Sequence, residues 1–216
     1  MVRLITALLL FFILPSPAQN TPGACNNFWL KANYTGLPQA TSEKDKALQL
    51  LKNSNGHDTL KAKAYNTLGI YQDLANNPTQ ALLEYKKAQG YLTKYPELKV
   101  YVDINKTQAY EALTDYAKSL EVSTTALKQH KKTLTLQTTA LLYHAQATAY
   151  FRMSDINTAA AYALKGIALL EKQKDSCYVY LLKLTLANTY IQTNNYDFAI
   201  TLFEEYFKNN GHARGT

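Results

Sequence analysis

The sequence predicts an all-α fold in which similar helix hairpins stack on one another, and two observations lead to this prediction. Apolar residues recur at steps of three and four on both sides of Asn194-Asn195, the spacing of two amphipathic helices joined by a tight turn. The same turn returns upstream at intervals of 40, 40 and 38 residues, at Asp155, Asp115 and Asn77. One hairpin cannot bury its apolar face alone, so this period indicates a repeat protein.

The first 18 residues have the pattern of a secretory signal peptide. A positive start at Arg3 is followed by an apolar run of eleven residues, Leu4 to Leu14, and small residues precede a cleavage site between Ala18 and Gln19. Eleven residues are too few for a membrane-spanning helix, which needs roughly 20. We therefore expect an exported protein, periplasmic or extracellular, with no transmembrane segment in the mature chain and with association to the envelope left open.

Cys25 has two interpretations besides a free thiol. Gly23-Ala24-Cys25 has the ending of a lipid-attachment box, but Pro22 stands where Leu is expected. A disulfide with Cys177 would need a long reach, since Cys25 precedes the first helix pair and Cys177 opens the last. Neither cysteine has a Cys or His neighbour at metal-ligand spacing, so we expect no metal and no cofactor.

Residues 19–41 are predicted to be an irregular lead-in, because two prolines and two glycines interrupt them. Phe28, Trp29, Leu30 and Tyr34 are nevertheless too apolar to be wholly solvated. We expect them to form a short helix that covers the exposed end of the stack.

Residues 42–210 are predicted to form the repeats, and residues 211–216 a tail. The first helix should begin at Ser42, where Ser-Glu-Lys-Asp is similar to a capping box. The hairpins that follow are expected over residues 58–91, 98–130, 136–172 and 180–207.

The charge of the chain does not favour nucleic-acid binding. The chain has 23 basic and 16 acidic residues, and loss of Arg3 with the signal peptide lowers the net charge from +7 to +6. The densest basic cluster, Lys128 to Lys132 around His130, falls where a helix should end, and cations there complement the helix dipole. Nucleic-acid binding would require the basic residues to gather on one face.

The repeats resemble the tetratricopeptide repeat family over residues 42–210. The resemblance is carried by Tyr65-x-x-Leu68-Gly69 and then Asn77, Ala81, Tyr85 and Ala88. The chain departs from the family where Thr107, Ala147 and Ala187 stand at the position of Gly69, and where its period of about 40 exceeds the family's 34. The six extra residues amount to roughly one and a half helical turns, which would lengthen each hairpin without breaking it.

The resemblance implies a right-handed α-solenoid of stacked antiparallel hairpins whose concave face, lined by the first helix of each unit, binds a protein or peptide. Such a protein would be a non-catalytic scaffold or sensor input domain of the cell envelope. The lining mixes charged and apolar groups, which suits a helix or an extended peptide with an apolar face. The implied groove residues are Lys63, Asn66, Ile70 and Asp73; Tyr101, Ile104, Gln108 and Glu111; His144, Thr148, Phe151 and Arg152; and Leu181, Leu184, Asn188 and Ile191.

Two other classes of function are catalysis and glycan binding. His144 with Glu111 is the one conceivable acid–base pair, and the chain has neither a phosphate-binding glycine loop nor a nucleophile elbow, so we expect no enzyme. A surface glycan-binding lipoprotein with similar helices is the alternative, because the chain has 17 tyrosines. Most of these fall at packing positions; among the aromatic residues, Tyr101 and Phe151 are the exceptions.

The last helix carries a second apolar line at Ile200 and Phe207 that no following helix would cover. Terminal repeats normally have a polar outer face. We therefore expect this end to be closed by a partner, by another copy of the chain, or by sequence of a longer parent protein.

Overall fold

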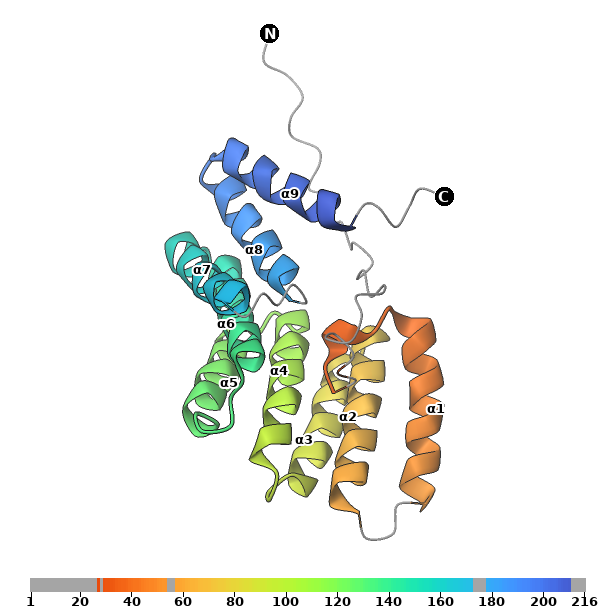
Figure 1. Cartoon of the computed structure of the whole chain (residues 1–216). Helices are drawn as coiled ribbons and strands as arrows, with labels where there is room; N and C mark the ends of the chain where they lie inside the picture. The colour runs from red at the N-terminus through yellow and green to blue at the C-terminus, as the bar shows by residue number, and fades with distance from the viewer. Residues whose placement is uncertain (1–26, 28, 54–56, 173–177, 211–216) are drawn as a thin grey trace.

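The computed structural model describes residues 27, 29–53, 57–172 and 178–210, and the regular structure in these ranges is helical throughout (Figure 1). The predicted signal peptide, its cleavage site at Ala18 and both cysteines lie outside the described residues. A short 3-10 helix, η1 (Lys31–Asn33), comes first. It is followed by α1 (Leu37–Asn53), α2 (Asp58–Leu74), α3 (Pro78–Tyr91), α4 (Pro96–Ala112), α5 (Tyr116–Gln129), α6 (Leu136–Arg152), α7 (Ile156–Lys172), α8 (Val179–Gln192) and α9 (Tyr196–Asn210).

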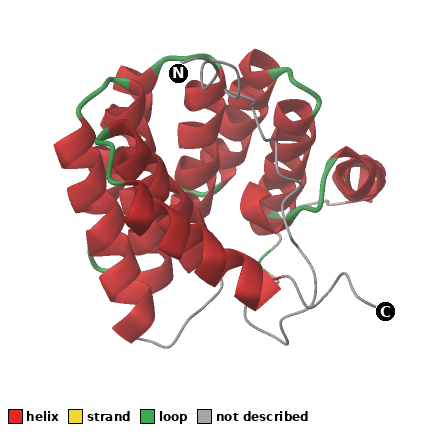
Figure 2. Ribbon diagram, turned by 90° about the horizontal axis from the view of Figure 1, so that it is seen from above, coloured by secondary structure: helices red, strands yellow, loops and turns green. Residues whose placement is uncertain are grey.

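The helices pack in the order in which they follow one another, so that α2 and α3, α4 and α5, α6 and α7, and α8 and α9 form hairpins. The even-numbered helices also contact one another along the stack, α2 with α4, α4 with α6, and α6 with α8. We call these four helices the inner row. Seen from above, the stack follows a curved path (Figure 2). The predicted fold class, an all-α solenoid-like stack of helix hairpins, is confirmed.

The same turn closes each of the four hairpins. Its middle residue has a left-handed backbone, with φ of 60° at Asn76, 58° at Thr114, 66° at Ser154 and 61° at Asn194. The next residue donates its N–H to the carbonyl five positions earlier, as Asp115 does to Tyr110 at 2.9 Å. This bond closes the end of the inner helix by satisfying a carbonyl that has no partner within the helix. The structural period therefore agrees with the predicted intervals of 38, 40 and 40 residues.

Two glycines let neighbouring helices approach closely. In α2, a Cβ on Gly69 would overlap the Tyr85 ring of α3, and in α7 a Cβ on Gly166 would come within 2.6 Å of Leu182 of α8. Tyr85 is fully buried by this contact. Bulk on one helix is thus matched by the absence of a side chain on the other.

The first helix begins earlier than predicted, at Leu37 instead of Ser42. Gly36, with a φ of 139°, turns the chain, and its carbonyl accepts the first helical hydrogen bond from Ala40 at 3.1 Å. Pro38 then falls in the first turn, where the missing N–H costs nothing. The capping-box pattern at Ser42 therefore lies inside a helix that has already started.

A short helix does form ahead of α1, but it is η1, which Trp29, Leu30 and Tyr34 flank, and this segment does not cover the end of the stack. Residues 29–34, which we call the docked segment, lie against the inner row, with hydrogen bonds to Asn66 of α2, to Asn105 of α4 and from Tyr178 at the start of α8. The expectation of an end cap was wrong because it rested on apolar character alone. The polar contacts with the inner row decide where the segment lies.

Candidate functional site

The inner row holds the docked segment by its main chain. The carbonyl of Trp29 accepts hydrogen bonds from the side-chain amides of Asn66, at 2.9 Å, and Asn105, at 2.7 Å. The N–H of Lys31 donates to Oδ1 of Asn105 at 2.9 Å, and the two asparagines are joined by a further bond of 3.0 Å. Both asparagines are fully buried. They satisfy one another and the peptide backbone together, so neither amide is left unpaired at a cost to stability.

The side chains of the docked segment join two buried clusters. Leu30 is only 2% exposed and belongs to the cluster that contains Ile104 of α4 and Leu186 of α8. Tyr34, also 2% exposed, belongs to the cluster built around α2 and α3, and Trp29 packs against that same cluster. The docked segment is therefore part of the interior of the molecule.

A buried carboxylate receives the cation of the docked segment. Nζ of Lys31 lies 2.6 Å from Oδ2 of Asp73, whose side chain is 1% exposed. The other oxygen of this carboxylate, Oδ1, is buried and has no hydrogen-bond partner among the described residues. The ammonium group thus satisfies half of the carboxylate.

A second carboxyl lies close enough to interact with this ion pair. Burial raises the pKa of Glu111 to about 8, and the negative charge of Asp73 contributes to this rise. A hydrogen bond from Oγ of Ser119, at 3.2 Å, and the charges of Lys31 and Arg152 act in the opposite direction. At neutral pH the Glu111 carboxyl is therefore mostly protonated.

The predicted groove residues of α2 and α4 divide into two groups. Asn66 and Asp73 contact the docked segment of the same chain, and their role toward a partner stays a prediction, while Ile70 and Ile104 are buried in the two clusters. Tyr101 packs against the cluster around Ile104. The remaining members of this group are Lys63, which is exposed, Gln108, which is half-buried, and Glu111.

For most of the predicted groove residues of α6 and α8, the described structure shows no hydrogen bond or ion pair with the docked segment. They form the less buried part of the inner row. His144, Thr148, Phe151, Leu181 and Leu184 are half-buried, whereas Arg152, Asn188 and Ile191 are exposed.

Asn105 makes the most contacts with the docked segment and was missed by sequence reasoning. The prediction placed groove residues by the repeat offset, and an offset of 38 from Asn66 falls on Ile104 instead. One residue rotates a helix face by about 100°, so the offset missed the correct position by one residue. A usable signal was present, because an asparagine between Ile104 and Thr107 interrupts a buried stripe and needs partners.

His144 and Glu111, the one acid–base pair that the sequence made conceivable, share no hydrogen bond in the described structure. Burial lowers the pKa of His144 to about 4, so the imidazole is neutral near pH 7. Glu111 receives its side-chain hydrogen bond from Ser119, and the described structure shows none between Glu111 and His144. Two largely uncharged groups without a shared hydrogen bond do not form a proton relay.

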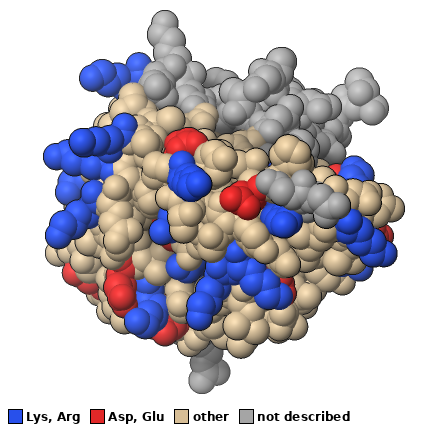
Figure 3. All heavy atoms as spheres, turned by 90° about the horizontal axis from the view of Figure 1, so that it is seen from below, with Lys and Arg blue, Asp and Glu red and all other residues tan. Residues whose placement is uncertain are grey.

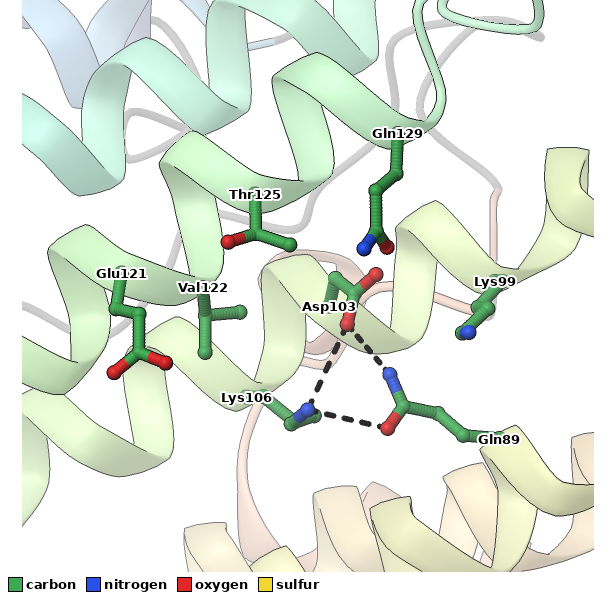
Figure 4. A pocket seen from close by; sticks show the side chains of 8 residues that line it. All are labelled: Gln89, Lys99, Asp103, Lys106, Glu121, Val122, Thr125 and Gln129. Carbon is green, nitrogen blue, oxygen red and sulfur yellow. Dashed lines mark hydrogen bonds and ion pairs between the residues drawn. The ribbon is translucent and has the colours of Figure 1, made fainter.

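A shallow pocket of about 240 Å³ opens between α3, α4 and α5, and Asp103 lies at its centre (Figure 4). The Asp103 carboxylate accepts a hydrogen bond from Gln89 at 2.5 Å and lies 3.1 Å from Nε2 of His130 and 3.7 Å from Nζ of Lys106. Nζ of Lys106 also donates to Gln89 at 3.1 Å. Since Asp103 bonds groups from α3, α4 and the end of α5, the pocket is best explained as a network that ties three helices together, although Nδ1 of His130 is buried without a partner among the described residues.

The described residues hold no cluster of three or more His, Cys, Asp or Glu side chains that could bind a metal ion. None of the helices in the described ranges is both long and apolar enough to cross a lipid bilayer. Basic side chains on the face shown in Figure 3 are interspersed with acidic ones.

The described side chains on the outer face of α9 are exposed to solvent. Phe198 is 63% exposed and Ile200 is 53% exposed. The side chain of Phe207 lies outside the described set, so self-association through Ile200 and Phe207 stays a prediction.

Comparison with models of known protein families gave no match, and comparison with curated protein sequences gave none either.

Proposed function

We propose that this chain is a non-catalytic binding protein of the tetratricopeptide-like kind, which takes an extended segment of a protein partner onto its inner row. One observation carries the proposal. Asn66 and Asn105 hold the carbonyl of Trp29, and Asn105 also accepts the N–H of Lys31. These contacts are made to the peptide backbone, which any extended segment presents, and they resemble the way in which binding domains hold peptides by main-chain hydrogen bonds.

The part of the inner row beyond the docked segment supports the same role. On α6, Phe151 is half-buried and the following residue, Arg152, is exposed. On α8, Leu184 is half-buried and Ile191, about two helical turns later, is exposed. A mixed apolar and charged surface of this kind suits a peptide with an apolar face better than a uniformly acidic tail. It extends the surface that a partner could cover from α4 toward α8.

The signal peptide assigns this function to the periplasm or the extracellular space. Mass spectrometry of the protein recovered from its producing cell tests this assignment. We expect a mature chain that begins at Gln19, and a chain that retains Met1 would contradict export.

The glycan-binding alternative gains no specific support. The tyrosine rings pair with each other across hairpins, Tyr65 with Tyr91 at 5.7 Å and Tyr150 with Tyr162 at 5.6 Å between ring centroids. Lys87 and Lys61 lie over the first pair. Rings engaged in this way do not offer an open platform on which a sugar could stack.

Site-specific photo-crosslinking in the producing cell tests the proposed function. A photoreactive phenylalanine analogue is placed at Phe151 on the inner row or, as a matched control, at Leu164, which is exposed on α7. We expect a discrete protein adduct from position 151 that is absent from position 164. Equal adducts from both positions, or none from position 151, would contradict binding at the inner row.

A further inference from the structure

The docked segment leaves one strong acceptor of the inner row unused. Asp73 is held in the interior, its Oδ2 bonded to Lys31 and its Oδ1 buried without a partner among the described residues. A buried acceptor with no partner is unfavourable, and the Lys31 ammonium group bonds Oδ2 alone. A guanidinium group is a planar fork that can bond both oxygens of a carboxylate in parallel.

The other contacts define the order in which a ligand must present its groups along the chain. The backbone carbonyl lies on Asn66 and Asn105, the next side chain is an apolar group in the position of Leu30, and the one after that carries the cation. The Lys31 side chain is 23% exposed, so the group that carries the cation is reached from solvent, whereas the Asp73 carboxylate is 1% exposed.

The cation at this position also acts on Glu111. Burial raises the pKa of Glu111 and the hydrogen bond from Ser119 lowers it, and the charges of Lys31 and Arg152 lower it further, whereas the charge of Asp73 raises it. A bound cation also lowers the pKa of Glu111, which lets a second negative charge form beside it.

We infer that the preferred ligand of the inner row is a short protein segment that adopts the backbone conformation of residues 29–34, with an apolar residue followed by arginine, which replaces the docked segment and bonds both oxygens of Asp73. This inference rests on the proposed function and names the chemistry of its partner. The docked segment, with lysine at that position, is the internal and weaker form of the same ligand.

Fluorescence anisotropy with three labelled synthetic peptides tests the inference. Each peptide has the sequence of residues 27–36, with lysine, arginine or citrulline at the position of Lys31. They are titrated into the full-length protein carrying Lys31→Ala, which keeps Leu30 and the backbone contacts but weakens the internal competitor. We expect the arginine peptide to bind about tenfold or more tightly than the lysine peptide, the scale of one satisfied buried acceptor. The uncharged citrulline peptide should bind most weakly.

The control background adds Asp73→Asn, which should reduce the difference between the three peptides to less than about threefold. Equal binding of all three peptides to Lys31→Ala would overturn the arginine preference and leave the proposed function standing. Absence of binding by every peptide would overturn displacement of the docked segment, and a Phe151 crosslink would then show that a partner binds without it.

A second readout needs no added peptide. In the full-length chain, Lys31→Arg should raise the midpoint of thermal unfolding above that of the wild type, because the fork then reaches Oδ1 of Asp73. The same change in an Asp73→Asn background should give no increase. An unchanged or lower midpoint for Lys31→Arg alone would overturn the inference independently of the peptide titrations.

Discussion

Asp73 and Glu111 lie 38 residues apart at equivalent places in successive helix pairs, yet they have different partners. Asp73 forms an ion pair with Lys31 at 2.6 Å, whereas burial raises the pKa of Glu111 to about 8. The docked segment places its cation in direct contact with Asp73, whereas at Glu111 the charge of Lys31 only partly offsets the effect of burial. The stability of the molecule should therefore depend on pH through Glu111.

Glu111 should destabilise the fold as the solution becomes alkaline. Its pKa is 4.5 in the unfolded chain and about 8 in the folded one, so the folded state holds the proton more tightly between these values. Stability falls as pH rises through this window and levels off above it. We expect a loss on the order of 2–4 kcal/mol between pH 5 and 8.5, which Glu111→Gln should largely remove.

Urea unfolding at several pH values measures this effect. Glu121→Gln is the matched control, since Glu121 is an exposed glutamate on α5 paired with Lys118. The control should retain the wild-type pH dependence above pH 5. A wild-type stability that is flat from pH 5 to 8.5 would contradict the assignment.

His144 should act on the acid side. Burial lowers its pKa from 6.5 to about 4, so the unfolded chain takes up a proton in this window before the folded chain does. Stability is therefore lost as pH falls from about 6.5 toward 4, on the order of 1–3 kcal/mol, and His144→Gln should flatten that part of the curve. His57→Gln, at an exposed position before α2, serves as the control and should leave the curve unchanged. A steep acid limb in His144→Gln would assign the loss to other groups.

Gly69→Ala should destabilise the first hairpin. The added methyl group would overlap the Tyr85 ring, which is fully buried and has no room to move aside. We expect a loss of about 1–3 kcal/mol, typical of overpacking. Gly90→Ala is the control, because nothing lies within 4 Å of its added Cβ, and it should be neutral or stabilising by up to about 1 kcal/mol. Similar effects of the two changes on urea unfolding would show that the contact is not tight.

Thr114→Gly should stabilise the protein. Thr114 has a φ of 58°, a left-handed backbone that a β-branched residue adopts only with strain. Glycine removes this strain, for a gain on the order of 1 kcal/mol in the free energy of unfolding. Asn76→Gly, at the equivalent turn, should change stability by much less, because asparagine tolerates this conformation. A destabilised Thr114→Gly would indicate that the threonine side chain contributes to the turn.

Asn105→Ala should loosen the docked segment. It removes the hydrogen bonds to Trp29, Lys31 and Asn66 and leaves buried groups without partners. We expect a loss of about 2–4 kcal/mol and faster hydrogen exchange at Lys31. Asn188→Ala, at an exposed position on α8, should have little effect on either measurement. Wild-type exchange at Lys31 in Asn105→Ala would show that the segment is held by its side chains alone.

Much of the fold could be predicted because it depends on local sequence. The periodic apolar residues set the helices, and turn residues at Asn77, Asp115 and Asp155 mark where each hairpin reverses. The boundary of α1 was missed by five residues because Gly36 and Pro38 form a helix start that is less familiar than the capping-box pattern at Ser42. Of the candidate site, Asn66 and Asp73 were anticipated from the repeat pattern, whereas Asn105 was not.

By itself the sequence determined an all-α chain of hairpins with a period near 40 residues, because helix periodicity and turn chemistry act over a few neighbouring positions. Only the tertiary structure decided what lies on the inner row. Lys31 meets Asp73 across 42 positions, and Asn33 meets Tyr178 across 145. Contacts over such distances depend on how the stack curves, and therefore on the summed packing of every hairpin between them.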